Sequence, residues 1–351
     1  MEDAMPKRRS MLTIAAWLIA AAFGFGLPAV GSAAADDAIK VTPDNFVRAE
    51  TDMYFKLWAS RALGRFVHFR DFPLENTGVR PNRDTLYSQA VFDLDAGPVT
   101  ITIPDSGDRF MSMIVFDEDH YVHGVYYDAG THSFSRDDIG SRYMSVFFRT
   151  FANPNDAADV KAAHALQDAI GVQQPGGPGK LEVPNWDKAS QDKVRNALLT
   201  LNETLPDLRH AGGTREEVDP VRHLIATASA WGLNPDSDAI YLTVTPAQND
   251  GQAVYRLVVP GDVPVGAFWS VTVYDATGHF QKNDLNAYSL NNVTAARSPD
   301  GSVAVQFGGC DGKIPNCLPT LPGWNYMVRL YRPKPEILDG SWTFPEAQLA
   351  S

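Results

Sequence analysis

The densest group of potentially reactive side chains lies at residues 80–88 (RPNRDTLYS). An arginine can hold a carboxylate through two parallel hydrogen bonds, and an aspartate can act as a base. We therefore predict ligand contacts from Arg80, Asn82 and Tyr87, with Asp84 as a candidate catalytic base and Ser88 as a candidate nucleophile. The alternative is a turn before a strand, in which these side chains only satisfy backbone groups.

A second polar and aromatic group follows Trp269. Aromatic rings mixed with asparagine and serine suit a sugar-like or polyol ligand, which needs stacking and hydrogen bonds. The predicted ligand contacts here are Trp269, Tyr274, Tyr288 and Asn292. The same residue types also fill the loops of an ordinary β-sandwich, and that alternative stays open.

Residues 117–123 (DEDHYVH) hold three carboxylates and two imidazoles. His120 is a second candidate base. Such a density of oxygen and nitrogen atoms can bind a divalent metal, but alternate residues of a strand point apart and no matching set follows nearby. We predict no metal site and no cofactor.

The common catalytic motifs are missing from the sequence. It contains no Gly-x-Ser-x-Gly, no His-Glu-x-x-His, no phosphate-binding glycine loop and no dinucleotide fingerprint. These absences argue against the commonest hydrolases, metalloproteases and nucleotide-dependent enzymes.

Alternation of apolar and polar residues predicts most of the secondary structure. It predicts strands at residues 86–94, 99–103 and 110–116, joined as an antiparallel meander, and a hairpin that joins residues 240–244 to 255–259 across Asn249-Asp250-Gly251. Helical spacing predicts a helix from Thr42, with Pro43 in its first turn, and helices between residues 153 and 232. Many short strands with few interleaved helices predict a mainly β fold.

Composition and charge narrow the class of protein. The 351 residues are 44% hydrophobic and 21% charged, which is typical of a folded chain. The net charge is −12, and removal of residues 1–35, which carry a net +1, takes it to −13. So acidic a chain is not expected to bind nucleic acid or an anionic membrane.

The N-terminus has the pattern of a cleaved export signal over residues 1–35. Basic residues 7–9 precede an apolar run at 13–27 that is too short to span a membrane, and small residues follow at 33–35. Paired arginines leave the twin-arginine and the general secretory routes both open. We expect a periplasmic or secreted protein in which Cys310 and Cys317 form a disulfide; a reactive or metal-binding thiol pair is the alternative.

Longer motifs resemble a known pair of bacterial domains. Residues 80–88, 97–99 and 108–113 resemble the N-terminal domain of unknown function 1254. Residues 268–275, 286–289 and 328–342 resemble its usual C-terminal companion, domain of unknown function 1214. The resemblance implies an immunoglobulin-like β-sandwich followed by a jelly-roll β-sandwich, and it implies no established activity.

The sequence thus predicts an export signal (1–35), an N-terminal sandwich with a leading helix (36–152), a helical connecting segment (153–234) and a C-terminal jelly roll (235–351). We predict that the protein binds a small polar or sugar-like ligand between its domains. An esterase-like or glycoside-acting hydrolase and an envelope structural or assembly protein are the alternatives. The sequence leaves the oligomeric state open.

Overall fold

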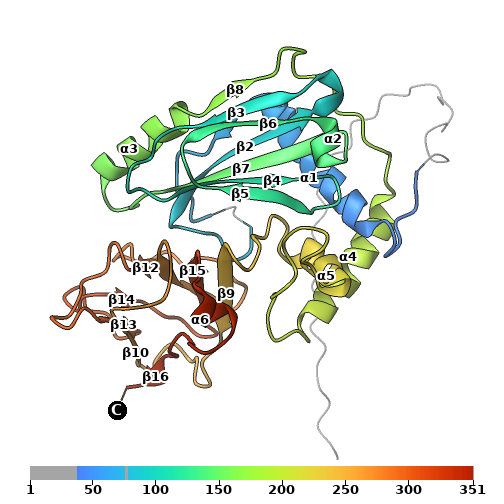
Figure 1. Cartoon of the computed structure of the whole chain (residues 1–351). Coiled ribbons are helices and arrows are strands. Elements are labelled where there is room, and N and C mark those ends of the chain that lie inside the picture. Colours follow the sequence, from blue (N-terminus) through green and yellow to red (C-terminus); the bar gives the residue numbers. More distant parts are fainter. Residues whose placement is uncertain (1–37, 76–77, 351) are drawn as a thin grey trace, which may run out of the picture. The chain divides into compact units, whose positions relative to one another are not determined.

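The computed structural model describes residues 38–75 and 78–350. The export signal predicted at residues 1–35 lies outside the described residues. The described elements are mainly strands with several helices, which confirms the predicted fold class (Figure 1). Within these two ranges, no helix combines the length and the apolar character that crossing a membrane requires.

The N-terminal part contains a five-stranded and a three-stranded sheet (Figure 1). The larger sheet has the order β1-β2-β7-β4-β5, formed by Val67–His68, Thr85–Asp93, Tyr143–Phe151, Met111–Phe116 and Val122–Tyr126. The smaller sheet has the order β6-β3-β8, formed by Gly130–Phe134, Val99–Ile103 and Gly171–Gln173. Short helix α2 (Arg136–Ile139) precedes β7, and helix α3 (Ala157–Asp168) follows it.

The period-two pattern of β2 decides which side chains form the core between these sheets. Ala90 and Phe92 pack against Ile101 of β3 and Val146 of β7 in one buried cluster. The opposite face of β2 is also buried, because Val91 packs against Phe55 of helix α1 (Phe46–Ala62). Strand β2 is therefore covered on both faces, which restricts the roles that its side chains can play.

The predicted meander is wrong. Strands β2 and β4 each pair with β7, whereas β3 pairs with β6 and β8 in the other sheet. A single helical turn at Leu94–Ala96 and Gly97, with φ +117°, redirect the chain between the sheets. Helix α1 also begins later than predicted, since the Asn45 side chain accepts a hydrogen bond from the Thr42 backbone and holds residues 42–45 in a turn.

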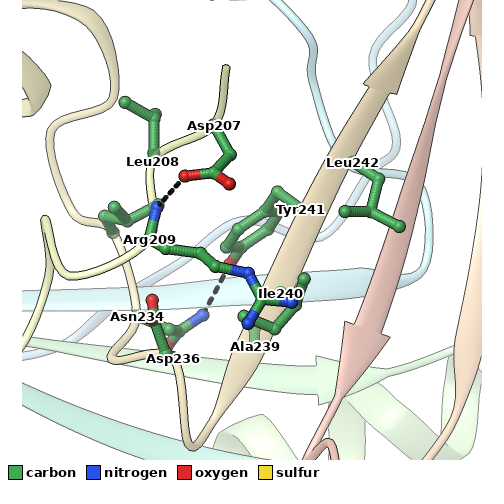
Figure 2. Close-up of a pocket in the computed structure, with 10 residues that line it drawn as sticks. Asp207, Leu208, Arg209, Asn234, Asp236, Ala239, Ile240, Tyr241 and Leu242 are labelled. Atoms are coloured by element: carbon green, nitrogen blue, oxygen red, sulfur yellow. Dashed lines mark hydrogen bonds between the residues drawn. The ribbon is translucent and has the colours of Figure 1, made fainter. Parts of the chain in front are cut away.

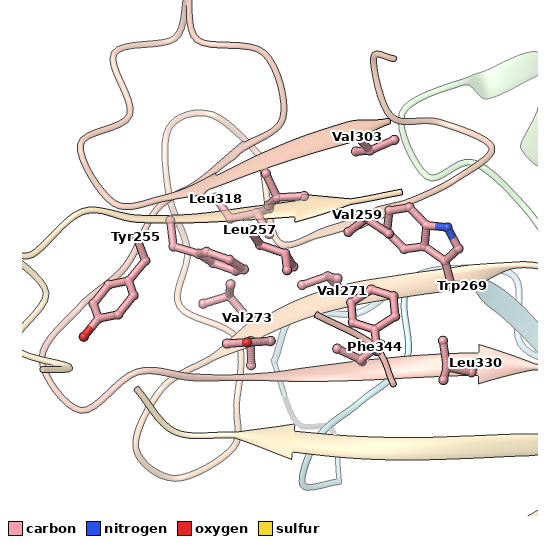
Figure 3. Packing of buried hydrophobic residues seen from close by; sticks show 14 of the residues in the cluster. Tyr255, Leu257, Val259, Trp269, Val271, Val273, Val303, Leu318, Leu330 and Phe344 are labelled. Atoms are coloured by element: carbon pink, nitrogen blue, oxygen red, sulfur yellow. The ribbon is translucent and has the colours of Figure 1, made fainter. Parts of the chain in front are cut away.

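The C-terminal part packs two four-stranded sheets face to face. One has the order β14-β13-β10-β16, formed by Cys317–Leu318, Val303–Phe307, Tyr255–Val259 and Gln348–Leu349. The other has the order β12-β11-β15-β9, formed by Ser289–Asn291, Trp269–Tyr274, Asn325–Tyr331 and Ala239–Val244. Figure 3 shows the core between them, where Leu257 and Val259 face Val271 and Leu330.

Strands β9 and β10 lie in different sheets, so the predicted hairpin is wrong. The loop between them is held elsewhere, because Asn249 donates to the Trp324 carbonyl and accepts from the Gly323 backbone. Short helix α6 (Pro335–Leu338) follows β15. The predicted disulfide between Cys310 and Cys317 is present.

Helices α4 (Lys188–Asn202) and α5 (Pro220–Ser229) pack against α1 around Phe46, Leu198 and Ile225. Asp219 caps α5, since its carboxylate accepts from two backbone N–H groups of the first turn, as is typical of an aspartate directly before a helix that begins with proline. Strand β8 and the loop after it bind to the N-terminal sheets, because β8 pairs with β3 and Gln174 donates to the Asp93 carbonyl. The predicted domain limits at residues 36, 153 and 235 stay predictions.

Candidate functional site

The two polar groups that the sequence singled out meet in the structure. The Asn291 side chain donates to Asp84 at 3.2 Å, and the Asn82 side chain donates to the Tyr331 hydroxyl at 2.9 Å. The Tyr274 hydroxyl donates to the Pro81 carbonyl at 2.7 Å. Residues 80–88 therefore lie against the sheet that contains β11, β12 and β15.

Strand alternation explains this meeting. In β11 and β15 every second residue points into the C-terminal core, including Trp269, Val271 and Val328. The residues between them point to the other face, which is polar and aromatic. We call the group that gathers there the arginine–tyrosine cluster; it comprises Asn82, Asp84, Tyr87, Arg149, Asn234, Tyr241, Ser270, Thr272, Tyr274, Asn291, Arg329 and Tyr331.

Arg329 binds residues 80 and 81 to the β11–β15 sheet. Its side chain is 3% exposed. It donates to the Thr272 hydroxyl at 3.0 Å, to the Tyr274 hydroxyl at 2.7 Å and to the Arg80 carbonyl at 2.9 Å. All of these acceptors are neutral, and no carboxylate oxygen of the described residues lies within 4.0 Å of the Arg329 side chain, so the only buried acidic group that acts on its charge does so from farther away: Asp84.

Arg149 is the second buried guanidinium of the cluster, at 5% exposure. It comes from β7, where it pairs with Tyr87 of β2, and its guanidinium lies 5.4 Å from the centre of the Tyr87 ring. It donates to the Asn234 side chain at 3.3 Å and to the Gly232 carbonyl at 3.1 Å, and it also bonds the Tyr87 hydroxyl. Asn234 in turn donates to the Tyr241 hydroxyl at 2.7 Å.

Asp84 is completely buried. Burial raises the pKa of its carboxyl, although the positive charge of Arg329 and the side chains of Ser270 and Asn291 oppose that rise. Among the described residues, neither Oδ2 of Asp84 nor the buried Ser270 hydroxyl has a well-aligned hydrogen bond, although the Ser270 side chain lies close enough to affect the Asp84 pKa. Buried polar atoms are nearly always paired, so two such atoms in one place are unusual.

The tyrosine hydroxyls of the cluster differ in acidity. Burial raises the pKa of Tyr331 well above its ordinary value, and it also raises the pKa values of Tyr241 and Tyr274. For Tyr87 burial acts in the same direction, but the Arg149 charge and hydrogen bonds from Asn82 and Arg149 outweigh it and lower its pKa. Neighbouring groups whose pKa values move apart are typical of functional sites.

The cluster reaches the surface at two small cavities. One is lined by Asn234 and Tyr241 together with residues 207–209 (Figure 2), and it has a volume of about 10 Å³. The other is lined by Tyr274 and Tyr288 and measures about 20 Å³. Each holds about one water molecule. Neither cavity has room for a molecule much larger than water.

Four of the predicted ligand residues lie at the edge of the cluster or outside it. Trp269 belongs to the C-terminal core, and Asn292 accepts a hydrogen bond from the Trp269 backbone. Tyr288 packs with Phe280 next to the Arg83 guanidinium. Arg80 adopts φ +54°, an uncommon left-handed conformation for a side chain of this size, and it bonds Asn325.

The predicted catalytic residues do not come together. Ser88 is fully buried on the other face of β2, where its hydroxyl contacts His68 at 2.8 Å and Gln167 at 3.2 Å. His120 is buried in a stack with Trp231 and His223. Its Nε2 accepts from the Gly232 backbone at 2.7 Å and its Nδ1 contacts the Thr227 hydroxyl. Both ring nitrogens of His120 are thus occupied by structural partners.

Sequence reasoning missed Arg149, Arg329, Tyr241 and Tyr331 as site residues. A signal was present, because each arginine interrupts an apolar run that predicts a buried strand. A charged residue inside such a strand is rare unless it is paired or functional. As for metals, no group of three histidine, cysteine or acidic side chains with metal-binding geometry occurs in the described part of the chain.

These observations define the chain as a mainly β protein in which a buried, arginine-rich face joins two sets of sheets. Comparison with known families then identifies the parts. Residues 63–133 match the family described as protein of unknown function DUF1254, and residues 239–335 match protein of unknown function DUF1214. The chain therefore carries both domains in the order that its motifs predicted. No curated protein matches it.

Two solved structures are similar to the chain. The VPA0106 protein from Vibrio parahaemolyticus has 18% sequence identity and a TM-score of 0.68, covering 88% of this chain and 98% of that one. An uncharacterised protein from Burkholderia cenocepacia has 12% identity and a TM-score of 0.49, covering 88% of each chain. The similarity to the Vibrio protein shows a shared fold.

Proposed function

We propose that this protein binds a small polar ligand at the arginine–tyrosine cluster. One observation carries the proposal: two guanidinium groups, an unpartnered carboxyl oxygen and an unpartnered hydroxyl are gathered in one buried place. Burying polar and charged groups without full partners lowers stability. A ligand that satisfies these groups gives a reason for the arrangement, and the tyrosine rings offer stacking surfaces for a sugar-like molecule.

The proposal includes export to the periplasm or the medium. It is supported by the basic, apolar and small-residue pattern of residues 1–35 and by the Cys310–Cys317 disulfide, since disulfides persist in oxidising compartments. Cell fractionation with an antibody against the mature chain tests this part of the proposal. Recovery of the unprocessed chain in the cytoplasm alone would contradict it.

Binding is tested by thermal unfolding of the purified protein with a panel of sugars, polyols, amino acids and organic acids. At least one compound is expected to raise the unfolding temperature, because ligands that bind only the native state stabilise it. The shift should be much smaller in a variant carrying Asp84→Asn and Ser270→Ala. Asp137→Asn, at an exposed position on α2, is the matched control and should retain the full shift.

The hydrolase alternative has one observation in its favour, the contact between Ser88 and His68. Ser88 is 0% exposed and its hydroxyl is shared with Gln167, so a substrate carbonyl has no path to it in this form. Binding is therefore the better-supported function. Hydrolysis of ester or glycoside substrates that is lost in Ser88→Ala would reverse this order.

A further inference from the structure

We infer that the ligand of the arginine–tyrosine cluster is a small hydroxylated organic acid whose carboxylate is held by Arg149. This inference rests on the proposed function and adds the chemical class of the ligand and the residue that anchors it. It follows from the charge balance of the cluster, from the hydrogen bonds of Arg149 and from the position of Asn234.

The buried charges at this site do not balance. Arg83, Arg149 and Arg329 are exposed by 6%, 5% and 3%, and the nearby buried carboxyl is Asp84. Among residues 38–75 and 78–350, no aspartate or glutamate oxygen lies within 4.0 Å of these three guanidinium groups. Asp84 offsets part of the Arg329 charge, but positive charge remains in excess, and buried charge in excess is unfavourable, so the cluster favours a ligand that brings negative charge.

Arg149 is better placed than the other two arginines to bind that charge. The terminal nitrogens of Arg329 already make short bonds to Thr272, Tyr274 and the Arg80 backbone. Arg83 donates to the Phe72 carbonyl and lies over the Tyr288 ring, outside the cluster. The bonds of Arg149 to Asn234 and to the Gly232 carbonyl are both longer than the usual 2.9–3.0 Å, and its other partner is the neutral Tyr87 hydroxyl.

The longer of these bonds is also the easier to replace. At 3.3 Å, Arg149 contacts the side-chain oxygen of Asn234, which can rotate away, whereas the Gly232 carbonyl is part of the backbone. A carboxylate that takes the place of this amide gains two charge-assisted hydrogen bonds from the planar guanidinium. The exchange therefore favours an acid over a neutral ligand.

Asn234 links Arg149 to a small cavity. Although only 4% exposed, it lines with Tyr241 the cavity of about 10 Å³ that Figure 2 shows, and its side-chain oxygen accepts from Arg149. Tyr87 and Tyr241 keep part of their surface exposed, which indicates that this end of the cluster is not fully sealed. A ligand can enter here once the Asn234 side chain turns aside.

The remaining groups of the cluster favour hydroxyl groups on the ligand. Asp84 Oδ2 and the Ser270 hydroxyl lack partners, and an acceptor and a hydroxyl of this kind pair with ligand hydroxyls. Asn82 connects Asp84 to the Arg149 end, because its side chain accepts from the Asp84 backbone and donates to the Tyr87 and Tyr331 hydroxyls. An acid with hydroxyl groups along a short carbon chain or ring, such as a sugar acid, matches this order of partners.

The test uses acids paired with neutral analogues of the same shape: glucuronate with glucose, gluconate with sorbitol, and lactate with propane-1,2-diol. Titration calorimetry is carried out on the whole mature protein and on Arg149→Gln. At least one acid is expected to bind wild type about 30-fold or more tightly than its neutral partner, and to lose about 30-fold or more in Arg149→Gln. Arg136→Gln, at an exposed arginine of α2, should leave the affinity unchanged.

Each outcome decides a different point. If a neutral sugar binds as tightly as its acid, and Arg149→Gln does not matter, the inference is wrong while the proposed function stands. If neither acids nor neutral compounds bind, both are wrong. If Arg149→Gln does not fold, Asn234→Ala replaces it in the test. This variant removes the amide that competes for Arg149, so it should bind the acid more tightly than wild type does. An unchanged or lower affinity for the acid would overturn the role assigned to Arg149.

Discussion

Asp52 offers a quantitative test of how this fold handles buried charge. It lies on α1 with 1% exposure, and its Oδ2 accepts a hydrogen bond from the Trp186 indole at 2.8 Å. Its Oδ1 is buried without a partner. Burial raises the pKa of Asp52 from 3.8 to about 6, and the negative charge of Glu118 adds to this rise. The hydrogen bond from Trp186 and the positive charge of Arg48 oppose it.

The raised pKa fixes the direction of the pH dependence. Between about pH 4 and pH 6 the folded state holds a proton on Asp52 that the unfolded state has released, so this group's contribution to stability decreases as pH rises through that window. A difference of about two pKa units corresponds to about 3 kcal/mol of unfolding free energy lost by neutral pH.

Asp52→Asn removes the charge and keeps an acceptor for Trp186. The new amide N–H group at the Oδ1 position lacks a partner and offsets about 1–2 kcal/mol of the gain. We expect Asp52→Asn to stabilise the protein by about 1–2 kcal/mol at about pH 7.5 and to lose this advantage near pH 4. Equilibrium urea unfolding at both pH values measures the effect, and Asp44→Asn, at an exposed position, is the control. An equal change at both pH values would refute the reasoning.

Three further variants test other parts of the structure. Burial and the nearby charge of His223 keep the pKa of His120 well below 6.5, so the folded protein holds it neutral. The unfolded state takes up the proton first, so the free energy of unfolding should fall as pH drops below about 6.5. His120→Gln should make this fall smaller in urea unfolding measured across a series of pH values. Ser88→Ala removes hydrogen bonds to His68 and Gln167 and should cost about 1–2 kcal/mol in urea unfolding without changing ligand affinity; an altered affinity would place Ser88 in the site. Cys310→Ser opens a short loop and should cost about 2–3 kcal/mol under non-reducing conditions, with the reduced wild type matching the variant; a stability equal to that of the oxidised protein would contradict a structural role for the disulfide.

Local pattern was enough to predict the strands and several helix ends. The alternation in β2 correctly separates Ala90 and Phe92 from Val91, and Asp219 caps α5 as its type and position predict. Strand partners were not predictable in the same way. The meander and the hairpin are wrong because pairing depends on contacts far apart in sequence, and two neighbouring strands of a sandwich can lie in different sheets.

The candidate site was predictable only in part, for the same reason. Residues 80–88 and the β11 region do meet, as their polar character suggested. Trp269 packs in the C-terminal core, whereas its neighbour Ser270 points to the opposite face of β11 and belongs to the cluster. Arg149 and Arg329 were missed because each looks, within its own strand, like an isolated polar residue.

The central claim is that the arginine–tyrosine cluster binds a ligand. Native mass spectrometry of the mature protein, purified from the cells that produce it and compared with its denatured mass, tests this most directly. We predict a non-covalent mass difference in wild type that is lost on denaturation and is absent from the variant carrying Asp84→Asn and Ser270→Ala. A wild-type protein whose native and denatured masses agree, or a mass difference that persists in that variant, would contradict the claim.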